Sequence, residues 1–226
     1  RFILNNYVSS SLHLWSNVDK NDLGNALKKL NAVDERFENL KKIQNVFLNC
    51  YFNSPNTSNL FEKLITDEKI DFSRYNYFYA SYLFDNGDID KAKKIVNLAL
   101  NISPRNLLLN QYKYDLTQRV TKQSFSCKKI EHPVAEILYI AANALSSQSI
   151  YPLSNFYLNL AKYLNEDFNS YETLVAENFY KINNNDEAKK IYNNLKKKGK
   201  AFQWYSSKQL ARIYIKEDEQ EKALEL

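Results

Sequence analysis

The stretch Tyr75 to Asn106, YNYFYASYLFDNGDIDKAKKIVNLALNISPRN, decides the fold of this chain. In its first half, Tyr79, Ala80 and Leu83 recur at the spacing of residues on one face of an α-helix. The sequence Asn-Gly-Asp then interrupts this pattern, and a second helical pattern begins after it. The stretch therefore predicts two helices joined by a tight turn.

The turn and the second helix carry their own signals. Gly87 can adopt a positive φ where the first helix ends, and Asp88 can cap the helix that follows. Pro104 cannot continue a helix and closes the unit. Three small or apolar residues form the inner stripe of the second helix: Ala92, Val96 and Ala99.

Small residues recur further along the chain in two registers. The first register is Ala142, Ala176 and Ala211, at spacings of 34 and 35 residues, and the second is Ser154, Ala188 and Ala223. A fixed period of this length is typical of stacked helix pairs. Small side chains at these positions allow the backbones of paired helices to approach closely.

These residues resemble the tetratricopeptide repeat (TPR) family, which has small residues at the places of Ala80, Ala92 and Ala99 and a proline at the place of Pro104. The resemblance implies an all-α, right-handed superhelical solenoid of about five or six antiparallel helix pairs, in which each unit contacts only its neighbours. The mixture of regular and irregular units is similar to bacterial TPR proteins of unassigned role.

The period divides the chain unevenly. Ala80 and Ala142 are 62 residues apart, six fewer than two units of 34 residues require, so one helix pair between them is irregular. In the N-terminal third, helices are expected at 7–15, 23–33, 37–52 and 60–70. The expected units are residues 1–72 as degenerate helical repeats, 73–105 as a TPR-like unit, 106–134 as an irregular pair and connection, 135–168 and 169–203 as TPR-like units, and 204–226 as an incomplete unit.

Composition limits the class of protein. Three Gly and four Pro in 226 residues are too few turn formers for a many-stranded β fold. No apolar run reaches the roughly 18 residues of a membrane span. The chain contains no Met and ends within an expected helix, so we expect a fragment of a longer protein. Its compartment, cytoplasm or bacterial cell envelope, is left open.

The residues that usually carry chemistry are sparse. Cys50 and Cys127 are far apart and in no ligand spacing, which favours two separate buried thiols, with a disulfide as the alternative. His13 and His132 are too few for a histidine-rich metal site. The sequence has no glycine-rich phosphate loop and no hydrolase or metalloprotease motif. We expect no catalytic residues, no metal and no cofactor, and therefore no enzyme in this chain.

The basic run KKKGK, residues 196–200, is the strongest local charge feature. Cations at the C-terminal end of a helix, with Gly199 as its cap, are the ordinary explanation. An anionic partner is the alternative. The net charge of +5 is small for a dedicated nucleic-acid-binding protein, so no nucleic acid is expected as a partner.

The TPR resemblance implies that the first helix of each unit lines a concave groove. Positions off the buried stripe of these helices are aromatic, polar and charged, which suits a peptide or helix from another protein. The expected groove residues are Tyr77, Ser81, Phe84, Tyr139, Asn143, Thr173, Glu177, Tyr180, Tyr205, Lys208 and Arg212.

The sequence therefore predicts a scaffold or adaptor that binds a partner protein in this groove. One alternative is a docking or localisation arm of a larger enzyme or membrane-anchored protein. A second is an RNA-binding helical repeat, but Ser81, Asn143, Glu177 and Arg212 at equivalent places form no consistent code. Glu177 also argues against a clamp for a C-terminal carboxylate, because its own carboxylate would repel one.

Overall fold

The computed structural model describes residues 2–18, 22–67, 73–118, 120 and 123–226. Within these ranges the chain is all-helical, as predicted, and has no strand and no helix long and apolar enough to cross a membrane. The α-helices are α1 (Phe2–Ser16), α2 (Leu23–Asn31), α3 (Glu38–Tyr51), α4 (Thr57–Ile65), α5 (Tyr75–Asp85), α6 (Ile89–Ile102), α7 (Leu107–Thr117), α8 (Glu131–Ser147), α9 (Tyr151–Leu164), α10 (Ser170–Lys181), α11 (Asn185–Leu195), α12 (Lys200–Lys216) and α13 (Gln220–Leu224).

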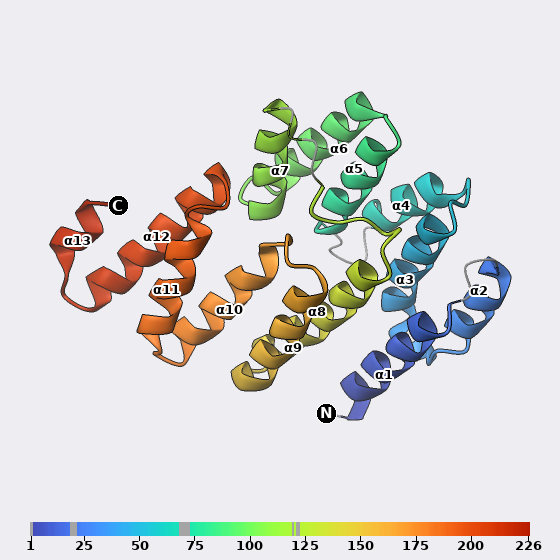
Figure 1. The fold of residues 1–226 in the computed structure, drawn as a ribbon, viewed down its shortest axis with the longest axis horizontal. Helices are drawn as coiled ribbons and strands as arrows, with labels where there is room; N and C mark the ends of the chain where they lie inside the picture. The colour runs from blue at the N-terminus through green and yellow to red at the C-terminus, as the bar shows by residue number, and fades with distance from the viewer. Residues whose placement is uncertain (1, 19–21, 68–72, 119, 121–122) are drawn as a thin grey trace.

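Most helices that follow one another in the chain pack side by side, although α7 and α8 do not (Figure 1). The tightest partners are α8 with α9, α5 with α6, and α10 with α11, and α9 in turn packs on α10. A short 3-10 helix, Glu35–Phe37, precedes α3. The helix expected at 60–70 is α4, which ends at Ile65, and residues 68–70 of that expectation lie outside the described residues.

The turn between α5 and α6 forms as the sequence predicts. Gly87 has a φ of 84°, in the left-handed region that favours glycine. Asp88 caps α6, because its side chain accepts a hydrogen bond from the backbone N–H of Lys91 at 3.2 Å. The two helices are thus antiparallel neighbours joined by a minimal connection.

Four of the six small residues of the two registers are buried, namely Ala142, Ser154, Ala176 and Ala188, whereas Ala211 and Ala223 are half-buried. Ala80, Ala92, Ala142, Ala176 and Ala188 have no exposed surface. Between α8 and α9 the contact is direct, since the Ser154 hydroxyl donates to the carbonyl oxygen of Ala142 at 2.8 Å. A hydroxyl can reach a helix carbonyl in this way only where the backbones are close.

We expect Ala142→Trp to lower the free energy of unfolding by about 1–3 kcal/mol, because a bulky side chain in this contact forces the two helices apart. Asn143→Trp is the matched control, since Asn143 is the next residue of α8 and is exposed. Urea unfolding followed by circular dichroism measures both. Equal midpoints for Ala142→Trp and the parent would contradict the placement of Ala142 in the helix contact.

Two further contacts join helices that are far apart in the sequence: α1 packs on α8, and α7 packs on α12 (Figure 1). In the second, the backbone N–H of Ala201 donates to Oε1 of Gln111 at 3.0 Å. A Cβ at Gly199, which has a φ of 148°, would lie 2.4 Å from the Gln111 side chain. Gly199 therefore directly precedes α12, and its lack of a side chain leaves room for Gln111 of α7. Its expected role as the cap of α11 is thereby corrected. Units that contact only their neighbours would make neither contact.

The connection between α7 and α8 returns across the molecule. Its residues Arg119, Thr121 and Lys122 lie outside the described residues. Cys127 forms a disulfide with Cys50 of α3, with the Cα atoms 5.9 Å apart, so the expectation of two separate thiols is wrong. His132, at the start of α8, accepts a hydrogen bond at Nδ1 from the Ser126 N–H at 2.9 Å, and burial lowers its pKa to about 4. These contacts hold the connection against α3 and α8.

Candidate functional site

A hollow near the predicted groove lies where α7, α8, α10 and α12 converge. It is a pocket of about 210 Å³. Its wall combines polar and apolar side chains from all four helices and from the residue that precedes α5. They are Arg74, Asn106, Leu107, Leu108, Tyr139, Ser170, Thr173 and Phe202.

The predicted groove residues of α5 do not reach this surface. Tyr77 and Ser81 are buried, because the connection that follows α7 lies over them. The Tyr77 hydroxyl is 2.6 Å from the Ser124 hydroxyl, and the Ser81 hydroxyl donates to the carbonyl oxygen of Phe125 at 3.1 Å. Phe84 is half-buried and packs against the core. Tyr77 and Ser81 are therefore core residues, which corrects their assignment to an open groove.

The predicted residues on α8 and at the start of α10 have mixed positions. Tyr139 is half-buried under the guanidinium of Arg74, whose Cζ lies 3.8 Å from the ring centroid. Thr173 is half-buried, and its hydroxyl donates to the carbonyl oxygen of Ser170 at 2.7 Å. Asn143 is exposed. Tyr139 and Thr173 line the pocket, and Asn143 does not.

The end of α10 and the start of α12 place a carboxylate and a phenol together. The Tyr205 hydroxyl donates a hydrogen bond to the exposed Glu177 carboxylate. Burial and the negative charge of Glu177 raise the pKa of Tyr205 well above its ordinary value. Tyr205 also packs edge-on against Tyr192 of α11, with ring centroids 6.0 Å apart. Tyr205 therefore stays neutral and fixes the Glu177 carboxylate at the surface.

The remaining predicted residues form a charged surface over α10 and α12. Lys208 and Arg212 are exposed on α12. The Arg212 guanidinium lies 5.4 Å from the ring centroid of Tyr180 on α10, and the Lys216 ammonium lies 5.3 Å from the same ring. The structure thus places Tyr180, Lys208 and Arg212 on one surface, and the two most distant of them in the sequence, Tyr180 and Arg212, are 32 residues apart.

Sequence reasoning missed three members of this surface, Tyr114, Trp204 and Lys216, and it noted Lys200 only as part of the basic run 196–200. Trp204 is 67% exposed, and the Lys208 ammonium lies 5.6 Å from its ring. The Lys200 ammonium lies 5.7 Å from the ring of Tyr114 on α7. The sequence contained a signal for the members on α12, because positions 200, 204, 208, 212 and 216 follow one another at the four-residue spacing of a helix ridge. Tyr114 had no such signal, since it comes from a helix distant in the sequence.

We name this surface the α12 row and define it as Lys200, Trp204, Lys208, Arg212 and Lys216. It offers cations, hydrogen-bond donors and aromatic faces. Among the described residues there is no group of three or more His, Cys, Asp or Glu side chains that could hold a metal ion. In comparisons with known proteins, no family model and no curated protein matches this sequence.

Proposed function

We propose that the protein is an interaction scaffold, which holds a segment of a partner protein on the surface formed by the 210 Å³ pocket and the α12 row. Two observations carry the proposal: a mixed polar and apolar pocket whose wall includes Phe202 of α12, and an exposed face of the same helix with cations and Trp204. Aromatic and Arg side chains are enriched at protein interfaces, and they supply much of the binding energy there.

Rigidity supports the same proposal. The surface is built on four helices rather than on long loops, and α7 is fastened to α12 by the hydrogen bond between Gln111 and Ala201. A preformed surface loses little conformational entropy when it binds. Extended peptides and single helices are the segments that such surfaces commonly accept.

The proposal includes a more detailed statement about the fold. We infer a TPR-like right-handed array in the chain from α5 onward, with the pocket and the α12 row on its concave side. The buried alanines of both registers and the contact between Ser154 and Ala142 support this inference. The contact of α7 with α12 makes the array more closed than a regular stack.

Two other roles are compatible with the same surface. The chain can serve as the docking or localisation arm of a larger enzyme or membrane-anchored protein, and its partner would then be a substrate or an anchor. RNA binding is the second role, and the cations of the α12 row are the feature in its favour. The first role keeps the surface as a protein-binding site, whereas the second changes the class of partner.

Affinity capture tests the proposal through two charge-matched variants. Lys208→Glu/Arg212→Glu alters the α12 row, and Lys63→Glu/Lys94→Glu changes the net charge equally at exposed positions on α4 and α6. Each protein is immobilised on a resin and incubated with a nuclease-treated extract of the source cells. Mass spectrometry then identifies the proteins that the resin retains. We expect proteins retained by the parent to be at least about tenfold depleted on the α12 variant and unchanged on the control.

Identical capture by the two variants would place the binding surface elsewhere on the molecule. Capture that is present in untreated extracts and vanishes after nuclease treatment would favour RNA. Circular dichroism melts of both variants accompany the experiment, because a loss of capture is informative only for a folded protein. Both substituted pairs are exposed, so unchanged melting temperatures are expected.

A further inference from the structure

The α12 row has a regular charge spacing. Its four cations, Lys200, Lys208, Arg212 and Lys216, stand at four-residue steps with Trp204 in the remaining place. No Asp or Glu occurs among the seventeen residues of α12. Four residues of an α-helix advance about 6 Å along its axis, so the row presents positive charge at intervals of about 6 Å or 12 Å.

These cations are not neutralised within the described residues. None of the four forms an ion pair there, although many other Lys and Arg side chains of the protein do. Arg212 donates to the Gln209 side chain at 2.9 Å, and Lys216 donates to Oδ1 of Asn183 at 2.6 Å. Both acceptors are neutral, so the positive charge of the row is left for a partner.

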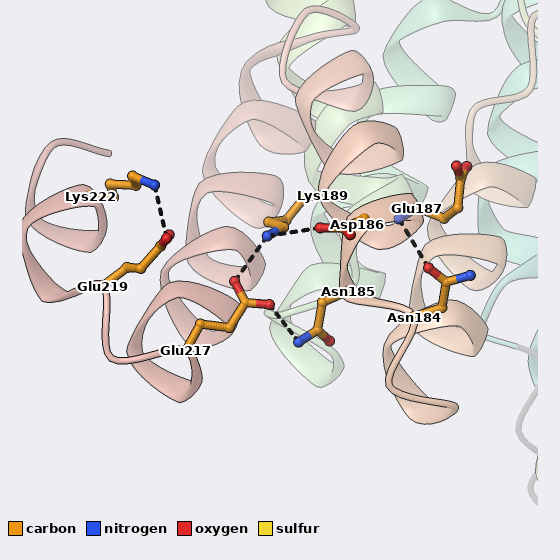
Figure 2. Close-up of polar contacts among 8 residues, drawn as sticks. All are labelled: Asn184, Asn185, Asp186, Glu187, Lys189, Glu217, Glu219 and Lys222. Atoms are coloured by element: carbon orange, nitrogen blue, oxygen red, sulfur yellow. Dashed lines mark hydrogen bonds and ion pairs between the residues drawn. The ribbon is translucent and has the colours of Figure 1, made fainter.

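Two acidic residues that follow α12, Glu217 and Glu219, already have other partners (Figure 2). The Glu217 carboxylate accepts hydrogen bonds from Lys189 at 2.9 Å and from Asn185 at 2.7 Å. Glu219 accepts from Lys222 at 2.9 Å. Figure 2 shows Lys189 held between Glu217 and Asp186, so these carboxylates point at α11 and α13 side chains. Glu217 and Glu219 thus form their hydrogen bonds without the cations of α12.

Aromatic rings hold the cations in place. Three rings from three helices lie under them, namely Tyr114, Trp204 and Tyr180. A long cationic side chain that rests on a ring loses less rotamer freedom when a partner binds. Trp204, 67% exposed, and Ile215, 57% exposed, add apolar area to the same helix. A partner that fits the row therefore needs both carboxylates and apolar side chains.

We propose that the α12 row binds an acidic amphipathic helix of a partner protein. Each four-residue step advances about 6 Å and turns about 40° around the axis, so carboxylates at the same interval on such a helix form a matching ridge that can meet Lys208 and Arg212 where the two helices cross. Leucine-type side chains between them cover Trp204 and Ile215. This inference rests on the proposed function, because it names the partner of the surface described above.

The surface is less suited to single-stranded nucleic acid. A phosphate backbone brings one negative charge with every nucleotide, and the exposed Glu177 carboxylate on α10 repels it. Nucleic acid also needs free aromatic faces for base stacking. The Tyr114 and Tyr180 rings are already covered by Lys200, Arg212 and Lys216. A helix can leave a neutral side chain opposite Glu177.

Fluorescence anisotropy with defined probes tests the inference. The probe is a fluorescein-labelled helical peptide of about 20 residues, long enough to span α12, with Glu at every fourth position and Leu beside each Glu. The controls are the same peptide with Gln for every Glu and an oligouridylate of similar length. We expect the Glu peptide to bind at least about tenfold more tightly than the Gln peptide, and less tightly as salt rises.

The variants then locate the binding. Lys208→Glu/Arg212→Glu is expected to weaken binding of the Glu peptide at least about tenfold, and Lys63→Glu/Lys94→Glu less than about twofold. The milder Lys208→Gln/Arg212→Gln covers the case in which charge reversal disturbs folding. Binding should also shift the emission of the exposed Trp204 to shorter wavelength, while Trp15, 1% exposed, stays unchanged.

Three outcomes overturn the inference. They are equal affinity for the Glu and Gln peptides, an unchanged affinity of the α12 variant, and tighter binding of the oligouridylate than of the Glu peptide. Failure of the proposed function is distinguished by the capture experiment, which needs no assumption about the partner's charge. A protein that captures partners through α12 but ignores the Glu peptide keeps the function and loses this inference.

Discussion

Glu136→Ala is expected to lower the free energy of unfolding by about 3–5 kcal/mol, which is the usual cost of removing one partner from a buried ion pair. Glu136 lies on α8 and has no exposed side-chain surface. Its carboxylate accepts two hydrogen bonds from the guanidinium of Arg74, at 2.8 and 2.9 Å. The pair joins the start of α5 to the middle of α8, across 62 residues of sequence.

The cost is high because Arg74 has no other carboxylate among the described residues. Its guanidinium also donates to the Ser170 hydroxyl at 2.9 Å and lies over the Tyr139 ring. Burial lowers the pKa of Arg74, but the charge and hydrogen bonds of Glu136, together with Tyr139 and Tyr171, raise it more in sum, so its pKa stays above the ordinary value. Without Glu136, a charge would remain buried and unpaired.

Chemical denaturation of three variants measures this effect. Glu131→Ala is the matched control on the same helix, since Glu131 is exposed in the first turn of α8 and is expected to cost less than about 1 kcal/mol. The double variant Arg74→Met/Glu136→Leu is expected to be more stable than Glu136→Ala, because it removes both charges. A loss for Glu136→Ala as small as that for Glu131→Ala would contradict the buried pair.

Local signals predict the helix hairpins of this protein well. Gly87 and Asp88 mark a turn through their own backbone preferences, and the structure has the turn there. Alanine marks helix contacts because a small side chain is required where backbones approach, as at Ala142. Each of these signals acts over a few residues or recurs with a fixed period, so a single sequence contains it in full.

The same reasoning cannot find contacts that have no period. The ion pair of Arg74 with Glu136, the disulfide and the contact of Gln111 with α12 each join segments brought together only by the complete fold. Tyr77 occupies a position that faces a groove in a regular helical array. The irregular connection after α7 covers it, and nothing near Tyr77 in the sequence signals this. The surface positions of Lys208 and Arg212 on α12 and of Glu177 on α10 were predictable because those helices follow the period.

The second large effect concerns the disulfide between Cys50 and Cys127. Reduction is expected to lower the free energy of unfolding by roughly 4–5 kcal/mol, because the bond closes a loop between residues 77 apart in sequence. Reduction frees the unfolded chain and raises its conformational entropy, and the folded contacts remain. Phe125, which is 1% exposed and packs on Phe47 and Phe78, keeps the connection attached in the folded state.

Urea unfolding with and without dithiothreitol measures this difference, and Cys50→Ala/Cys127→Ala supplies the control. The double variant is expected to unfold near the midpoint of the reduced parent and to be insensitive to dithiothreitol. Thiol titration of the unreduced, denatured parent should detect no free cysteine. Two reactive thiols in that sample, or equal midpoints with and without reductant, would contradict the disulfide. The disulfide also helps to hold the connection after α7 over Tyr77 and Ser81 of α5. The reduced protein is therefore expected to show faster amide hydrogen exchange in α5.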